Sequence, residues 1–163
     1  MGNVFGGGGL SLDLSNGATD VFVDALALAV SELADHEWDF RFAALLTWQN
    51  QDVLGRGFVG FDLEDVDWGA TPPERARAKD FVLRATALAR AGHRRAELGY
   101  EAPFADGYLD RFRAMVESFE PSAHTPPAGR FPSADEGAVA SCVRHRVLSA
   151  LPHWQGCFLC TRR

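Results

Sequence analysis

The sequence predicts an α+β fold that is mainly helical, with about four helices, a few short strands and a small C-terminal hairpin. Three observations indicate this fold class. Apolar residues recur at spacings of three and four over several long stretches, as they do on the buried face of an amphipathic helix. Strict alternation of apolar and polar residues is confined to short runs, which is typical of brief, half-buried strands. All three cysteines of the 163-residue chain lie near its C-terminal end, apart from the helical stretches.

The N-terminal segment is predicted to be a flexible lead followed by one short strand. The four glycines at 6–9 give the backbone no conformational preference, so we expect the lead to be poorly ordered. The sequence LSLDLS at 10–15 alternates apolar and polar residues and predicts a strand. Asn16 and Gly17 then form a common turn signal.

Two helices are predicted to follow this turn. Residues 19–34 place apolar side chains three and four positions apart, and Thr19 or Asp20 is available to cap the first turn. Residues 38–54 show the same spacing and predict the second helix. The Gly-Arg-Gly sequence at 55–57 is expected to end it.

One more strand and two more helices are predicted between residues 58 and 119. Residues 58–61 are apolar enough for a short strand. The sequence TPPE at 71–74 is the clearest helix start, because it combines a capping box with proline in the first turn. This helix is expected to continue to Gly92, where the basic residues 93–95 suit the negative end of its dipole. A fourth helix is predicted over about 105–119.

Composition divides the chain into three parts. Residues 1–120 are expected to form a mainly helical body, and residues 138–163 a zinc-binding type of tail that packs on it. Between them, residues 121–137 are rich in proline, glycine and serine and poor in apolar side chains, which predicts a linker.

The net charge of −6 limits the classes of partner. Binding to nucleic-acid phosphates needs a basic surface, so the acidity argues against such a partner and suits a basic protein instead. No apolar run approaches the ~20 residues of a membrane span, and the N-terminus lacks the basic and apolar regions of a secretory signal. We therefore expect a cytoplasmic protein with no membrane segment.

The tail holds two pairs of residues of the kind that bind structural zinc. Cys142 and His145 are separated by two residues, and so are Cys157 and Cys160. Each pair can hold one metal ion from a tight turn, and a hairpin that joins the pairs supplies the tetrahedral Cys₃His set of a closed zinc site. We therefore predict a zinc-knuckle hairpin with a structural zinc ion.

Several alternatives to this ligand set stay open. His153 is an alternate fourth ligand, a hydrogen-bonding partner of a ligand, or an ordinary loop histidine. A structural disulfide is disfavoured because three cysteines leave one unpaired. A redox Cys-x-x-Cys normally begins a helix after a strand, and a nucleophilic Cys/His pair has no supporting acid or oxyanion signal. Three thiolates also make zinc a poor Lewis acid, so a structural role is preferred to a catalytic one.

The run DLEDVDWG at 62–69 is predicted to be an acidic contact surface for a partner. Its carboxylates come from Asp62, Glu64, Asp65 and Asp67, and Trp68 is the expected anchor because tryptophan is enriched in interface hot spots. The run does not match a calcium loop, which needs acidic residues at its first, third and fifth positions. The alternative is a solvated acidic loop without a partner.

The segment Asp35-His36-Glu37 is a candidate for acid–base chemistry. Adjacent residues at a helix end point in different directions, so a helix terminus that faces solvent is the preferred interpretation. An enzyme is the alternative to a binding module, and it would need a concave site lined by these residues with shifted pKa values.

The C-terminal two thirds of the chain resemble a group of small bacterial proteins that end in Cys-x-x-His, a spacer and Gly-Cys-x-x-Cys. The resemblance includes the sequences FDLEDVDWG, AKDFVLRATALA and AELGYEAPFADGYLDRFRAMV, and it extends over about residues 58–163. Some such proteins are immunity partners of secreted bacterial toxins. The resemblance implies zinc binding and toxin neutralisation, and it implies no catalytic residues.

These features predict a zinc-stabilised, cytoplasmic protein-binding module of immunity type rather than an enzyme. The alternative is a small enzyme with a cleft between the helices and the tail. A third class is a nucleic-acid-binding zinc knuckle, because such knuckles also bind RNA. Its basic face would come from Arg144, Arg146, Arg162 and Arg163, but the acidic net charge places it last.

Overall fold

The computed structural model describes residues 3–49, 59–137, 140–141, 145–149 and 158–161. It confirms the mainly helical α+β fold class, with two small antiparallel sheets of two strands each. The elements are β1 (Asn3–Gly7), β2 (Leu10–Leu14), α1 (Asn16–Leu33), α2 (Glu37–Trp48), the 3₁₀ turn η1 (Leu63–Asp65), α4 (Pro72–Arg90), the 3₁₀ turn η2 (Arg95–Leu98), α5 (Ala105–Ser118), α6 (Ala134–Gly137), β3 (Ala140–Ser141), β4 (Leu148–Ser149) and α7 (Phe158–Thr161).

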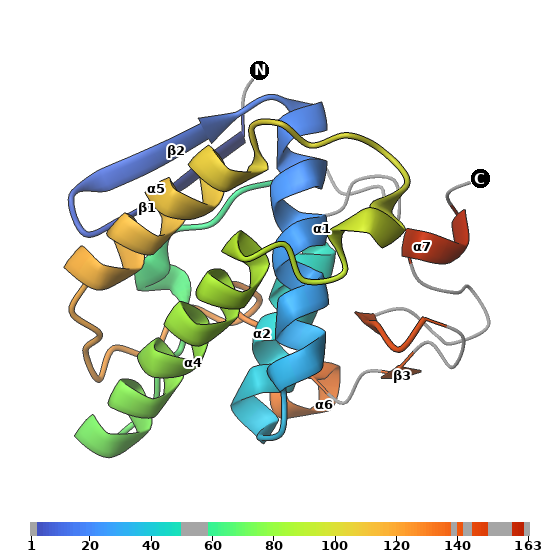
Figure 1. Cartoon of the computed structure of the whole chain (residues 1–163). Helices are drawn as coiled ribbons and strands as arrows, with labels where there is room; N and C mark the ends of the chain where they lie inside the picture. The colour runs from blue at the N-terminus through green and yellow to red at the C-terminus, as the bar shows by residue number, and fades with distance from the viewer. Residues whose placement is uncertain (1–2, 50–58, 138–139, 142–144, 150–157, 162–163) are drawn as a thin grey trace.

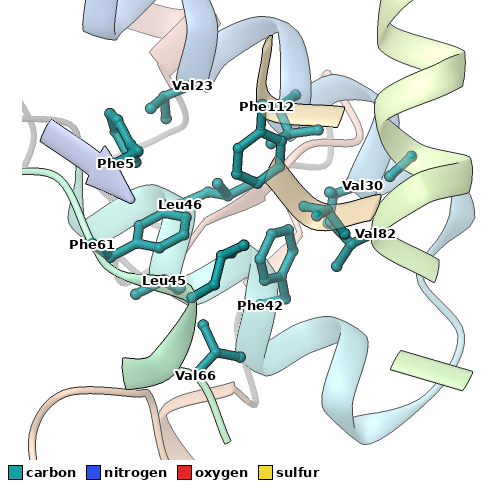
Figure 2. Close-up of a cluster of buried hydrophobic side chains, with 14 of the residues drawn as sticks. Phe5, Val23, Val30, Phe42, Leu45, Leu46, Phe61, Val66, Val82 and Phe112 are labelled. Atoms are coloured by element: carbon teal, nitrogen blue, oxygen red, sulfur yellow. The ribbon is translucent and has the colours of Figure 1, made fainter. Parts of the chain in front are cut away.

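Helix α1 is the centre of the molecule. Helices α2, α4 and α5 pack against it, and the hairpin formed by β1 and β2 lies along α5 (Figure 1). Figure 2 shows the core between these elements, where Phe5 of β1 lies near Phe61, and Phe61 in turn contacts Phe112 of α5. The rings of Phe5 and Phe61 meet edge-on, with centroids 5.0 Å apart. Such pairs add about 0.5–1.5 kcal/mol to the burial of their apolar surface.

The glycine-rich lead forms regular structure from Asn3 onward, whereas the sequence predicted a poorly ordered segment. It forms β1 and the turn of the hairpin, with Phe5 opposite Leu12 in the register of the sheet. At Gly8 the backbone has φ +61°, and a Cβ atom there would lie 2.7 Å from the carbonyl oxygen of Met115 in α5. Only glycine permits this approach, so the glycines serve tertiary packing that no local pattern indicates.

Helix α1 begins earlier than predicted. Asn16 and Gly17 belong to its first turn rather than to a separate turn, and the cap is Ser15 rather than Thr19 or Asp20. The Ser15 hydroxyl accepts a hydrogen bond from the Ala18 amide at 3.2 Å. Serine is among the best N-cap residues, and this explains the earlier start.

The predictions for α2 and for the strand after it are partly confirmed. Helix α2 buries the predicted apolar face, including Phe42, Leu45 and Leu46. The helix ends at Trp48 with Gln49 as its C-cap, and residues 50–57, with the rest of the predicted range and the predicted Gly-Arg-Gly stop, fall outside the described residues. Within the described residues of 58–61 there is no strand; instead the Gly6 amide donates to the Phe61 carbonyl at 3.1 Å, beside an isolated bridge.

The two later helices match their predictions closely. Helix α4 begins after Thr71 with the predicted capping box and proline at its first position. It ends at Arg90, so the basic residues 93–95 lie in the following turn and in η2 rather than at its last turn. Helix α5 buries an apolar stripe that faces α1 and α4, as its spacing predicts.

The segment 121–137 packs on the body instead of bridging open solvent as a linker. Phe131 is buried in the main core, and Arg41 of α2 lies over its ring at 4.7 Å from the centroid. The same arginine donates from Nε to the Pro132 carbonyl at 2.7 Å. The segment 121–137 is therefore attached to the body around Phe131 and Pro132. Its content of proline and glycine does not distinguish such an attached connection from a free linker.

The described part of the tail rests on α1 and η2. Val147 and Leu159 form a second, smaller apolar cluster with Leu28 and Leu98. The backbone amide of Leu148 donates to the Ser31 hydroxyl at 3.0 Å. Among the residues described, no helix has both the length and the apolar character needed to cross a bilayer.

Candidate functional site

Two of the predicted metal ligands lie side by side in the tail. The Nδ1 atom of His145 is 3.3 Å from the sulfur of Cys160, although the residues come from separate stretches of the chain. A tetrahedral zinc ion with Zn–S of about 2.3 Å and Zn–N of about 2.0 Å separates such atoms by about 3.5 Å. Cys142, Cys157 and His153 lie outside the described residues. The observed pair fits the chemistry of a zinc site, and it also fits a thiol–imidazole hydrogen bond.

Arg94 holds the backbone around His145 on the body. Its Nη2 atom donates to the His145 carbonyl, and its Nη1 atom donates to the Arg146 carbonyl at 3.4 Å. Glu97 holds the same guanidinium, with Nη2 to Oε1 at 3.1 Å, and this hydrogen bonding from Arg94 lowers the pKa of the Glu97 carboxyl. From the sequence, Arg94 was predicted only to lie at a helix end, because its partner His145 is 51 positions further along the chain.

The acidic run 62–68 sits on buried apolar side chains. Leu63, Val66 and Trp68 are all buried, and the Trp68 indole donates to the Leu63 carbonyl at 2.8 Å. Trp68 is only 2% exposed, so the prediction that it anchors a partner is wrong; it anchors the run to the core. Tryptophan enrichment at interfaces could not distinguish these roles, since tryptophan also fills cores.

The four carboxylates of the run have different surroundings. Asp67 pairs with Arg41, with 3.4 Å between Oδ2 and Nη2, and it also accepts from the Gly69 amide. Asp62 caps η1 by accepting from the Glu64 amide at 2.9 Å. Within the described part of the chain, no basic side chain pairs with Asp62, Glu64 or Asp65. These three carboxylates therefore form an acidic turn, defined here as residues 62–65, whose charge is not neutralised locally.

A pocket of about 520 Å³ lies at the end of the acidic run, beside Asp67 and Trp68. It lies between the start of α2 and the end of the acidic run, which are far apart in the sequence. Trp38 of α2 donates to the Asp67 carbonyl at 2.6 Å, and its ring stacks on that of Trp68 with centroids 5.6 Å apart. The pocket is lined by His36, Glu37, Trp38, Arg41, Asp67, Trp68, Gly69, Ala70, Glu74, Arg77, Ala123 and Thr125.

A buried ion pair supports the wall of the pocket. The Asp39 side chain is fully buried, and Arg77 of α4 donates from Nη2 to its two oxygens at 3.0 and 2.8 Å. The amides of Asp35 and His36 also donate to Asp39, each at 3.1 Å. Sequence reasoning missed this pair, because its members lie 38 positions apart and neither belongs to a recognisable motif.

Asp35, His36 and Asp39 bring three groups together that could hold a metal ion by distance alone. Their bonding argues against it. Both Asp39 oxygens accept from Arg77, and Nδ1 of His36 bonds to the Asp35 carboxylate. That bond from His36 lowers the pKa of Asp35, whereas a general acid or base at neutral pH needs a carboxyl pKa raised toward 7. The group is a hydrogen-bonded helix start.

No family model, curated protein or solved structure matches this chain. Functional inference therefore depends on the acidic turn, the pocket and the tail pair.

Proposed function

We propose that this chain is a cytoplasmic bacterial protein-binding module, whose acidic turn contacts a basic partner and whose tail is held by structural zinc. One observation supports the binding role most directly. Asp62, Glu64 and Asp65 lack basic partners among the described residues, yet their backbone is fixed by the buried side chains on either side. A charged surface that is already ordered loses little entropy on binding and steers an oppositely charged partner.

A toxin-neutralising role is the form of this function that we favour. An immunity-type protein must bind its toxin quickly and tightly, and electrostatic complementarity raises the association rate above that of a neutral surface. The net charge of −6 supports a partner of positive charge.

The partner can be identified and the surface tested in one series. The purified chain serves as bait in a lysate of the organism that encodes it, and the captured protein is then purified for titration. The double variant Asp62→Lys/Glu64→Lys is expected to weaken binding by about 10- to 100-fold, with a strong salt dependence in the wild type.

The matched control is Asp13→Lys/Glu101→Lys. Both residues are exposed and have no basic partner within the described chain, so this variant changes the net charge equally at another place. Binding that survives the first variant, or falls equally in both, would contradict the acidic turn as the contact surface.

Zinc has its own test, independent of the partner. The proximity of His145 and Cys160 supports a four-ligand site with Cys142 and Cys157, in which the cysteines would bind as thiolates. Elemental analysis of the purified protein is expected to give one zinc per chain, which Cys157→Ser and Cys160→Ser remove.

Two histidine variants identify the fourth ligand. His145→Ala is expected to lose zinc and His153→Ala to keep it, while the reverse result would assign the position to His153. His124→Ala, at an exposed residue outside the tail, serves as the control. Wild-type protein without metal would exclude the zinc site.

A further inference from the structure

The pocket at the end of the acidic run has the size and floor of a ligand site. Its volume of about 520 Å³ is within the usual range for sites that bind small molecules or side chains. The half-buried Trp38 forms the apolar floor with the buried Trp68 behind it, and both indole N–H groups already donate to backbone carbonyls. The floor therefore offers mainly apolar surface to an occupant.

The two arginines that line the pocket are already neutralised by carboxylates. Arg77 holds the buried Asp39 through two contacts of 3.0 Å or less, and Arg41 holds Asp67 at 3.4 Å. Arg41 is further fixed by the Pro132 carbonyl. An anionic ligand would have to compete with these carboxylates, and displacing Arg77 would leave Asp39 buried without its partner.

The start of α4 also gives an anion little to bind. Pro72 and Pro73 occupy its first two positions and carry no N–H group. The next amide, that of Glu74, donates to the Thr71 hydroxyl at 3.3 Å. The free amide donors that usually make a helix N-terminus attractive to anions are therefore lacking at this one.

Two carboxylates of the pocket form no ion pair with a described side chain, although Arg75 lies close enough to Glu74 to help lower its pKa. Glu37 is exposed in the first turn of α2 and forms no ion pair there. Glu74 accepts from the amides of Ala70 and Thr71 at 2.9 and 3.0 Å through one oxygen, Oε2. Its pKa is lowered, chiefly by the Thr71 amide, so it stays ionised at neutral pH. The pocket thus combines an apolar floor with excess negative charge.

We propose that this pocket receives an arginine side chain of the protein partner, with the aliphatic stem on Trp38 and the guanidinium at Glu37 and Glu74. This deepens the proposed function and rests on it. Arginine fits better than lysine because its guanidinium is planar, weakly hydrated and able to bond two carboxylates at once. Asp67 lines the pocket and follows the acidic turn by two residues, so one basic segment can contact both.

The test uses the whole chain and a pair of small probes. Nα-acetyl-arginine amide carries the proposed group, and Nα-acetyl-citrulline amide is its uncharged isostere. Titration followed by the NMR signal of the Trp38 indole N–H is expected to give a dissociation constant on the order of millimolar for the arginine probe, as for a single side chain. The citrulline probe is expected to bind at least about tenfold more weakly.

Three variants distinguish binding in the pocket from nonspecific attraction to the negative charge of the whole protein. Glu37→Gln is expected to weaken the arginine probe about fivefold, whereas Glu64→Gln in the acidic turn and Glu101→Gln on an exposed loop leave its affinity unchanged. Thermal unfolding of each variant verifies that the fold is intact. Equal affinity for both probes, or an unaffected Glu37→Gln, would overturn the assignment, and so would inorganic phosphate that binds at the Trp38 signal in place of the arginine probe.

The two proposals fail in different ways. If the arginine probe binds as described but no protein partner depends on the acidic turn, the pocket assignment stands and the protein-binding function falls. If a partner is lost with Asp62→Lys/Glu64→Lys while the arginine probe does not bind, the function stands and the pocket assignment falls.

Discussion

At the scale of single residues, the buried charge of Asp39 constrains how α2 packs against α4. Asp39 has no exposed side-chain surface and depends on Arg77 and on two backbone amides for its hydrogen bonds. A buried carboxylate that loses its cation keeps the cost of leaving water without the attraction that offset it.

Arg77→Ala is therefore expected to destabilise the protein strongly. The loss should lie near the lower end of the range of about 3–5 kcal/mol for breaking a buried ion pair, because Arg77 itself is 30% exposed. Urea unfolding followed by circular dichroism measures it. Arg84→Ala, which breaks the exposed pair with Asp80 on the same helix, should cost less than about 0.5 kcal/mol. Similar losses in both variants would refute the argument.

The type and spacing of residues predicted which side chains could bind a metal, but not which side chains are buried or what they contact. The pairing of Cys142 with His145 and of Cys157 with Cys160 could be proposed from spacing alone, and the structure brings His145 and Cys160 together. Trp68 was assigned to a surface and lies in the core, because burial is a property of the neighbours and not of the residue. The sequence did not predict the partners of Asp39 and Arg41 either, because these partners lie far along the chain and are neighbours only in the folded protein.

At the scale of elements, the sequence predicted the start of a helix correctly where the capping residues lie within its first turn. The capping box of α4 uses residues within one turn, so the sequence alone located it. The prediction of a strand at 10–15 is confirmed by β2, but β1 and the turn were missed because Gly8 is required by its approach to α5, more than a hundred positions later. The pocket shares this property, since it is formed by loops and helix ends that meet only in the folded chain.

The start of α4 is expected to contribute stability that depends on pH. Backbone hydrogen bonds from Thr71 and Ala70 lower the pKa of Glu74 below its usual value near 4.5. A lowered folded-state pKa means that the contribution is complete above that value and is lost as the pH falls through the folded pKa. Thermal unfolding of Glu74→Gln and wild type should therefore converge at low pH. Glu101→Gln should follow the wild type throughout, and a constant difference for Glu74→Gln would contradict this.

The turn of the hairpin offers a matched pair of glycines. Both have positive φ, +61° at Gly8 and +76° at Gly9, so alanine costs about 1–2 kcal/mol of backbone energy at either. A Cβ at Gly8 would also lie 2.7 Å from Met115 O, whereas none of the described atoms lies within 4 Å at Gly9. Gly8→Ala should therefore be less stable than Gly9→Ala by about 1–3 kcal/mol. If Gly8→Ala and Gly9→Ala had equal free energies of unfolding, the close approach of Gly8 to Met115 of α5 would not limit the residue at position 8.

At the scale of the whole molecule, the described part of the tail contacts the body at several points. Val147 and Leu159 pack with Leu28 and Leu98, the Leu148 amide donates to Ser31, Arg94 holds two carbonyls, and β4 lies against α2. In the proposed zinc site, metal binding would add to these contacts, and it is worth about 10–16 kcal/mol in comparable peptides. These contacts join residues far apart in the sequence, so composition did not indicate where the tail rests.

Removing the metal should loosen the tail and leave the body intact. Under a chelator, hydrogen exchange at the Leu148 amide is expected to accelerate strongly, while the amides of α1 and α4 keep their protection. Cys160→Ser should behave like the chelated wild type without any chelator. Unchanged exchange at Leu148 would mean that the tail is held by its apolar contacts alone.

The uneven distribution of the core along the chain has a consequence for biosynthesis. Among the described residues that are buried in the main core, only Phe131 comes after residue 119. Since chains emerge from the ribosome N-terminus first, at about 5–20 residues per second, most of the main core can form before the tail is made. The tail then meets Leu28, Leu98 and Arg94, the residues on which its described part packs, in elements that are already folded.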